Sequence, residues 1–291
     1  MLTRTFSDYI EKLASADTDM LLIHDSNGVK RISTETFKAD LREFAEGLET
    51  LLTQITFPGA GAHNGIYRGK NLGTSVSAEQ YAAIADGSFD DLYIGDYWVI
   101  NGVNWRIAAF DYYLTTGDTA CNTHHVVIVP DSKLYDAQMN TSNVTTGGYT
   151  GSAMYTANLD NAKTAINNAF GSAHILSHRQ YLTTTVANGR PSAASWFDST
   201  VELMTEQNVY GGKVFAPTSD GSNVPTVHTV DKSQFPLFAM RPDLISNRVT
   251  YWLRDVVSAA SFAVVGTGNG YAAYYHASAS LGVRPAFSIK S

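Results

Sequence analysis

The stretch DLYIGDYWVINGVNWRIAAF occupies residues 91–110 and carries the clearest structural signal in the chain. Residues 91–100 and 103–109 run apolar or alternate, and the pair Asn101-Gly102 separates them. An Asn-Gly pair between two apolar runs is typical of a β-hairpin, because both residues accept the positive φ of a type I′ turn. The stretch therefore predicts two antiparallel strands joined by a two-residue turn.

Short elements on either side of this hairpin predict a domain of mixed class. Apolar runs indicate further strands at residues 125–129, 249–254 and 283–289. Apolar side chains at helical spacing predict helices at about 156–170 and 199–206. Polar stretches, which we interpret as surface loops, cover residues 147–152 and 218–229. We expect an α+β domain with antiparallel sheets, two helices and long loops.

The first 57 residues predict a separate small α/β module. Residues 19–24 and 30–33 are short strands around the turn 25–28, and a helix capped by Thr34 or Thr36 follows. The apolar stripe of this helix predicts either an ordinary core face or self-association, and it consists of Phe37, Leu41, Phe44, Leu48, Leu51 and Leu52. Residues 58–62, Pro-Gly-Ala-Gly-Ala, break the pattern, so we divide the chain into domains at 1–57 and 58–291.

The composition excludes several classes of protein. Charged residues make up only 16% of the chain, the net charge is −7, and no cluster of Lys or Arg indicates a nucleic-acid partner. One cysteine, Cys121, allows no intramolecular disulfide. We expect no signal peptide and no insertion into a membrane, because no apolar run approaches the roughly 20 residues that cross a bilayer.

Candidate catalytic and metal sites are weak. His124 and His125 are neighbours on a strand, where they point to opposite faces. His174 and His178 have the spacing of one helical face, but the intervening Ile-Leu-Ser lacks the Glu of zinc proteases. Cys121 lies near histidine, yet a lone cysteine beside a strand more often packs as a small core residue. Neither Asp90-Asp91 nor Asp111 forms a recognisable glycosidase pair. We therefore expect no catalytic residue, no metal and no cofactor.

The window SFAVVGTGNGYAAYYHASAS, residues 261–280, contains no Lys, Glu, Gln, Met, Trp or Pro. Antibody loops favour Tyr, Ser, Gly and Asn, because rigid amphipathic rings bind at low entropic cost and small polar residues adapt. The alternative is a small-residue loop without a role. Composition alone leaves both interpretations open.

The end of the chain resembles the variable proteins of diversity-generating retroelements, which are similar to the major tropism determinant of phage. The sequence YWLRD at 251–255, the small-residue window, and LGVRPAF at 281–287 carry this resemblance. GDYWVINGVNWR at 95–106 resembles the opening of the same domain in gut-bacterial prophage proteins. DMLLIHD at 19–25 and KRI at 30–32 resemble the attachment segment of phage tail proteins. The lectin-like part of the resemblance covers residues 62–291.

The resemblance implies a C-type-lectin-like domain with a variable region at about 250–287. In that family, randomised adenines in Asn codons cannot produce Lys, Glu, Gln, Met or Trp, and the window obeys this restriction. By similarity, the varied ligand-binding positions are Ser261, Val264, Gly266, Thr267, Gly268, Tyr271, Ala273, Tyr275, His276 and Ala279. The scaffold residues would be Trp252, Arg254, Arg284 and Phe287, together with Phe262, Ala272 and Ala277.

The expected function is receptor binding at a phage tail tip, by a virion protein made in the bacterial cytoplasm. The partners would be a host cell-surface protein or glycan and other virion tail proteins, with a homotrimer as one possible assembly. Tyr271, Tyr275 and His276 are the expected anchors, and Tyr274 either joins them or packs inward. The alternatives are a structural virion protein with an inert window, or an enzyme on the scaffold of formylglycine-generating enzymes.

Overall fold

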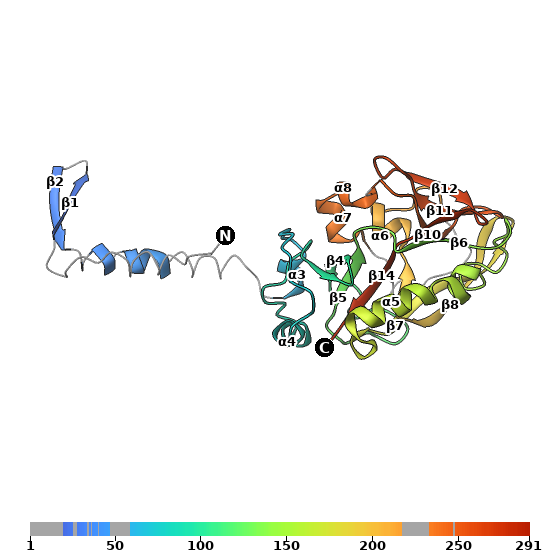
Figure 1. The fold of residues 1–291 in the computed structure, drawn as a ribbon, viewed down its shortest axis with the longest axis horizontal. Coiled ribbons are helices and arrows are strands. Elements are labelled where there is room, and N and C mark those ends of the chain that lie inside the picture. Colours follow the sequence, from blue (N-terminus) through green and yellow to red (C-terminus); the bar gives the residue numbers. More distant parts are fainter. Residues whose placement is uncertain are drawn as a thin grey trace. The chain divides into compact units, whose positions relative to one another are not determined.

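The computed structural model describes residues 20–25, 28–33, 35, 37–39, 41–46, 59–216, 233–246 and 248–291. The chain divides into two compact units, Met1–Phe57 and Pro58–Ser291, which are drawn in Figure 1. The polar stretch 218–229 lies outside the described residues.

The first unit contains the predicted hairpin. Strand β1 (Met20–Asp25) pairs antiparallel with β2 (Gly28–Ser33). Residues 35, 37–39 and 41–46 are helical, as the spacing predicts, and Phe44 of the apolar stripe is 62% exposed. Leu48, Leu51 and Leu52 lie outside the described residues. The roles of this unit in attachment or trimer formation stay predictions.

The second unit belongs to the mixed α+β class, and its centre consists of two five-stranded sheets. In spatial order, the first sheet contains β3 (Tyr97–Ile100), β4 (Val103–Phe110), β5 (Val126–Pro130), β14 (Pro285–Ile289) and β9 (Val201–Leu203). The second contains β12 (Ala272–His276), β11 (Ser261–Val265), β10 (Tyr251–Val256), β13 (Ser280–Val283) and β6 (Tyr135–Gln138). The pairing is antiparallel apart from β10 and β13, which run parallel.

The hairpin predicted from residues 91–110 is confirmed. Tyr97 pairs with Arg106, and Ile100 pairs with Val103 across the turn. Asn101 has a φ of 53° and Gly102 a φ of 77°, which are the left-handed values that the sequence predicts for this turn. The side chains of Trp98 and Trp105 are buried, so the hairpin carries two of the largest core residues.

Short helices connect and flank the strands of this unit. They are α3 (Ala60–His63), α4 (Ala78–Asp86), α5 (Asp160–Phe170), α6 (Glu206–Tyr210), α7 (Pro236–Met240) and α8 (Asp243–Ser246). A π-helix (Met154–Asn158) precedes α5 and a 3-10 turn (Ser172–His174) follows it, so the helix predicted at 156–170 is largely confirmed. The other long helix, α4, begins at a capping box of Ser77 and Gln80 and was not predicted.

The predicted helix 199–206 is wrong. Residues 201–203 form strand β9, which pairs with β14 through Val201 and Phe287. Three apolar residues within so short a run fit a strand as well as a helix. Pairing with β14 makes residues 201–203 a strand. The next helix, α6, begins only at Glu206.

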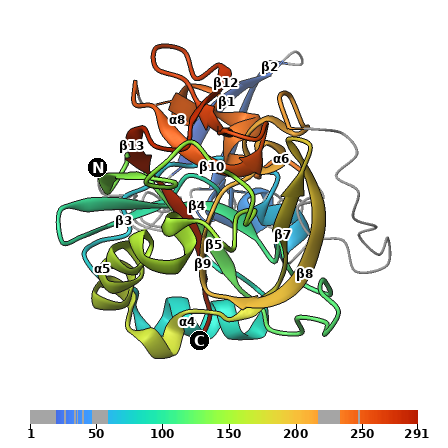
Figure 2. The ribbon, with the colours of Figure 1, turned by 90° about the vertical axis from the view of Figure 1, so that its right-hand side faces the viewer.

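Two ten-residue strands that were not predicted, β7 (His178–Ala187) and β8 (Arg190–Ser199), form a long hairpin. Figure 2 shows this hairpin and α5 on opposite sides of the central strands. The turn pair Asn188-Gly189 has φ values of 53° and 74°. This is the same Asn-Gly signal as at residues 101–102, and it would have predicted the hairpin.

The strand predicted at 283–289 is confirmed over residues 285–289, and its first residue, Val283, belongs to a strand of the other sheet. Strand β13 ends at Val283, β14 begins at Pro285, and Arg284 lies at the crossing. The Arg284 side chain is 1% exposed, and its guanidinium donates to the carbonyl oxygens of Pro130 and Ile245 at 2.8 and 2.7 Å. The two sheets share a buried apolar core. Within the described ranges, no helix is long and apolar enough to cross a membrane.

Candidate binding surface

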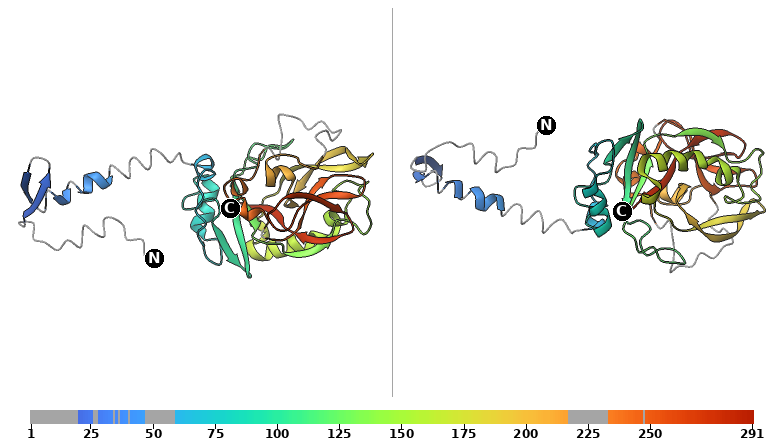
Figure 3. Two further views of the ribbon diagram at one scale, coloured as in Figure 1. Left: turned by 90° about the horizontal axis from the view of Figure 1, so that it is seen from above. Right: turned by 60° about the horizontal axis from the view of Figure 1, so that its bottom comes forward.

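Strand β12 forms one edge of the second sheet. Its inner neighbour β11 pairs with it in a continuous antiparallel register that runs from Ser261 opposite His276 to Val265 opposite Ala272. The loop between them contains Gly268 and Gly270, whose φ values of 89° and 77° suit glycine. β11 and β12 lie at the end of the unit away from α3 and α4 (Figures 1 and 3).

The two strands differ sharply in exposure. Every residue of β11 is buried, whereas Tyr274, Tyr275 and His276 of β12 are exposed. Tyr271, just before β12, is 56% exposed, and Tyr274 and Tyr275 are 53% and 52% exposed. A sheet edge that exposes several large aromatic side chains is a candidate contact surface.

The tyrosines of β12 point to two faces of the sheet. Successive side chains of a strand alternate, so Tyr275 lies on one face, and Tyr274 and His276 lie on the other. The Tyr274 ring meets Phe215 edge to face with a centroid distance of 5.2 Å. Tyr274 therefore stays outside the core and belongs to the exposed surface.

The ten predicted varied positions fall into three groups. Five are exposed: Thr267, Gly268, Tyr271, Tyr275 and His276. Two are half-buried: Ala273 and Ala279. Three are buried, contrary to the expectation of an exposed position: Ser261, Val264 and Gly266. Ser261 and Val264 belong to β11, an interior strand that is buried on both faces, and Gly266 lies against the Tyr271 ring, so these three do not reach a ligand on the surface. Whether the ten positions vary stays a prediction.

Gly266 is constrained by Tyr271. A Cβ atom at Gly266 would lie 2.5 Å from the Tyr271 ring, and the Gly266 amide donates to the Tyr271 carbonyl oxygen at 2.8 Å. The hydroxyls of Tyr210 and Ser246 donate to the carbonyl oxygens of Gly270 and Gly268, both at 3.1 Å. These contacts hold the loop of residues 266–271 against the unit and fix the Tyr271 ring.

The four predicted scaffold residues are all buried. The Trp252 indole N–H donates to the Ala137 carbonyl oxygen at 2.9 Å, which ties β10 to β6. The Phe287 ring packs edge to face on Trp105 at 5.5 Å. Arg254 and Arg284 donate to partners inside the protein. These residues have the structural position that the resemblance implies for a frame, and their role stays a prediction.

A buried polar chain that the sequence did not reveal lies beneath β10. The Glu202 carboxylate accepts from the hydroxyls of Tyr149 at 2.8 Å and Ser199 at 2.7 Å, and burial raises its pKa. Arg254 donates to the Gln180 side-chain oxygen at 2.9 Å. Gln180 in turn donates to Nε2 of His178 at 2.8 Å.

His178 is an unusual member of this chain. Its Nδ1 atom is buried and has no hydrogen-bond partner among the described residues, and its ring stacks on Tyr113 at 4.0 Å. Burial lowers the pKa of His178 to about 3, with smaller contributions from His125 and Arg254. The imidazole is therefore neutral near neutral pH.

Among the residues considered for catalysis, His124 and His125 both lie beside Asp111, with distances of 2.6 and 3.7 Å from Nδ1 to its carboxylate oxygens. Both histidines precede β5 and are not on a strand, contrary to the prediction. His174 lies in a 3-10 turn and His178 on a strand, so the pair shares no helical face. Asp91 pairs with Lys70 at 2.8 Å. Burial raises the pKa of the Cys121 thiol, which favours the unreactive neutral form. In the described part of the chain, no group of three or more potential ligand residues could hold a metal ion.

Comparison with known proteins gives no relative. No family model, no curated protein and no solved structure matches the chain. The function must therefore be argued from the surface itself.

Proposed function

We propose that this chain is a receptor-binding protein of a phage or prophage tail, with the exposed surface of β12 and the preceding loop as its binding site. We further propose that the second unit is a C-type-lectin-like domain and that a retroelement diversifies the surface. The mixed α+β class with largely antiparallel sheets is compatible with such a domain.

One observation carries the proposal. Tyr271, Tyr274 and Tyr275 are each more than half exposed and lie on or beside an edge strand, while the neighbouring strand is entirely buried. Tyrosines dominate binding hot spots because they offer a large amphipathic contact area at low entropic cost. Loss of their exposed faces from water on binding would provide much of the affinity.

The binding surface is separated from the determinants of folding. The scaffold residues Trp252, Arg284 and Phe287 lie in the core, and the tyrosine side chains project from it. A protein whose surface is diversified needs this separation, because substitutions there must leave the fold intact. The partners that we propose are a host cell-surface protein or glycan and, through residues 1–57, other tail proteins in the virion.

The test is an adhesion assay with the full chain and a panel of bacterial isolates. Tyr275→Ala should lower binding about tenfold or more and leave the melting temperature within a few degrees of the parent. Lys163→Gln, at a half-buried position of α5, is the control and should leave both quantities unchanged. Unchanged adhesion of Tyr275→Ala, or a large loss of melting temperature, would contradict the proposal. Adhesion to no isolate would favour the structural virion protein.

A further inference from the structure

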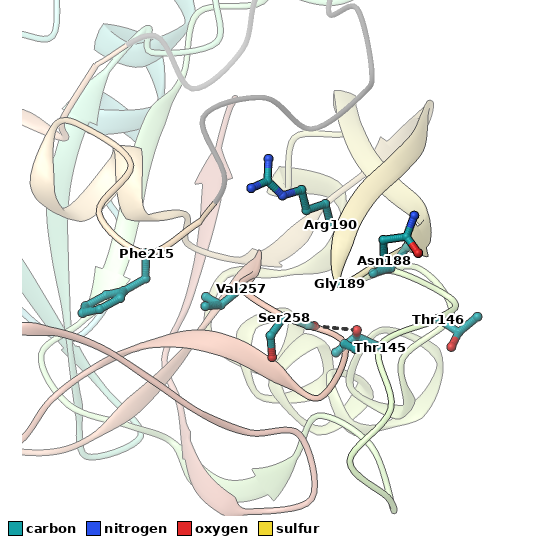
Figure 4. A pocket seen from close by; sticks show the side chains of 10 residues that line it. Thr145, Thr146, Asn188, Gly189, Arg190, Phe215, Val257 and Ser258 are labelled. Carbon is teal, nitrogen blue, oxygen red and sulfur yellow. Dashed lines mark hydrogen bonds between the residues drawn. The ribbon is translucent and has the colours of Figure 1, made fainter.

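A cleft with a volume of about 710 Å³ lies beside Tyr274 of β12, because Phe215 lines the cleft and contacts the Tyr274 ring. Figure 4 shows its walls: residues 145–146, the hairpin tip at 188–190, residues 257–259, and the Phe215 ring on the side opposite the hairpin. The volume is within the range of small-molecule sites, roughly 300–1,000 Å³.

The walls of the cleft are tied together by hydrogen bonds. Thr145 donates through its hydroxyl to the Ser258 carbonyl oxygen at 2.8 Å and through its amide to the Ala259 carbonyl oxygen at 3.1 Å. The Val186 amide donates to the Thr146 carbonyl oxygen at 2.9 Å. A preformed site of this kind pays little ordering entropy when a ligand binds.

Hydrogen bonds also fix the backbone around Phe215. The buried Glu206 carboxylate accepts from the amides of Val214, Phe215 and Ala216 at 2.9 to 3.0 Å. The Phe215 ring, 40% exposed, lines the cleft and also contacts Tyr274. The cleft and the Tyr274 face of β12 therefore form one continuous surface.

The polar side chains of the cleft are available to a ligand. Arg190 is exposed and extends from β8 over the cleft (Figure 4). Within the described part of the chain, the side chains of Arg190, Asn188 and Thr146 make no hydrogen bond or ion pair. Arg190 supplies a local cation on a chain whose net charge is −7.

We propose that this cleft binds a carboxylate-bearing sugar residue of an oligosaccharide. The carboxylate would pair with the Arg190 guanidinium, the hydroxyls would meet Asn188 and Thr146, and the next sugar ring would lie against Phe215 and Tyr274. An acidic peptide, which carries several carboxylates, fits less well, because Arg190 is the one basic residue among the described residues that line the cleft.

The cleft would supply the ligand class of the proposed receptor-binding protein. This inference rests on the proposed function, because Tyr274 belongs both to the binding surface and to the wall beside the cleft. None of the ten predicted varied positions lines the cleft. The cleft would thus be a constant subsite for a chemical feature that many receptors share, and the diversified surface beside it would read the rest of each receptor.

Isothermal titration of the full chain tests this proposal. The probes are sialyllactose and trigalacturonate, which distinguish a sialic acid from a uronic acid, together with the methyl ester of each and an oligoglutamate peptide. At least one carboxylated saccharide should bind, and its methyl ester should bind about tenfold more weakly. Arg190→Gln should cause the same loss, and Tyr274→Ala a smaller one. Arg248→Gln is the matched control, since Arg248 is also exposed but does not line the cleft, and it should bind as the parent does.

Several outcomes would overturn the proposal: no binding of either saccharide, equal binding of the methyl esters, an unaffected Arg190→Gln variant, or preference for oligoglutamate. Tyr275→Ala separates this proposal from the previous one, because Tyr275 lies on the other face of β12. It should lower adhesion to cells while leaving the saccharide affinity unchanged. If Tyr275→Ala retains both saccharide binding and adhesion, the proposed saccharide site would stand and the proposed binding surface on β12 would be contradicted.

Discussion

Strands β11 and β12 are hydrogen-bonded neighbours in opposite environments. β11 has the sequence SFAVV and is wholly buried, whereas β12 has the sequence AAYYH and is largely exposed. The difference comes from position, because β11 has strands on both sides and β12 is an edge. The window of residues 261–280 therefore contains both a structural and a binding element. Tyrosine content marks β12, and the sheet topology explains why β11 is buried.

The sharpest test of this comparison substitutes two residues that face each other across the strands. Phe262 of β11 lies opposite Tyr275 of β12, and Phe262 is 0% exposed. Phe262→Ala should lower the free energy of unfolding by about 3–5 kcal/mol, whereas Tyr275→Ala should lower it by less than about 1 kcal/mol. Urea denaturation measures both values. Similar losses for the two variants would mean that β12 is as much a part of the core as β11.

The buried polar chain beneath β10 predicts a loss of stability in acid. Burial holds the pKa of His178 at about 3 and also lowers that of His125, so the unfolded chain takes up protons more readily than the folded one. The contribution of His178 is present above pH 6.5 and is lost as the pH falls from 6.5 toward 3. The loss amounts to about 2 kcal/mol by pH 5.

Unfolding measured between pH 7 and pH 5 checks this prediction through a matched variant. His178→Gln keeps an acceptor for Gln180 but has no titratable group, so it should lose about 2 kcal/mol less than the parent over this range. The contribution of Glu202 to the pH dependence of stability has the opposite sign, because its raised pKa favours the folded state as the pH falls. Glu202 is present in both proteins, so its contribution cancels in the comparison. Equal pH dependence in the two proteins would show that His178 is not held neutral by burial.

The smallest predicted effect concerns the boundary between the two strands. In Gly266→Ala, the added methyl group would displace the Tyr271 ring, with a loss of stability of about 1 kcal/mol. When Tyr271 is already replaced by Ala, the ring no longer occupies this space, so Gly266→Ala should leave the free energy of unfolding nearly unchanged. A double-mutant cycle of the two substitutions measures their coupling. Additive losses would mean that Tyr271 does not rest on Gly266.

Local signals in the sequence predicted much of the fold. The Asn101-Gly102 hairpin and the helix that ends at Phe170 follow from turn chemistry and apolar spacing. Strand β9 was mistaken for a helix because pairing with β14, a contact with residues more than 80 positions away, decides its conformation. Local patterns carry no information about such pairing.

The site was predictable in part. Tyrosine content pointed to residues 271–276, but burial of Ser261 and Val264 depends on the place of β11 in the sheet. Phe215 was not found because its contact with Tyr274 joins distant parts of the chain. The hairpin tip at Asn188-Gly189, which forms one wall of the cleft, did carry a readable signal.

Sequencing of this locus across a bacterial population tests the central claim most directly. Codons 250–287 would be read beside any nearby template copy and reverse transcriptase gene. We predict that substitutions trace to template adenines and concentrate at the exposed positions Thr267, Gly268, Tyr271, Tyr275 and His276. At the buried positions Ser261, Val264 and Gly266, we predict that they are limited to small residues. A constant window without a template copy would contradict a diversified binding surface.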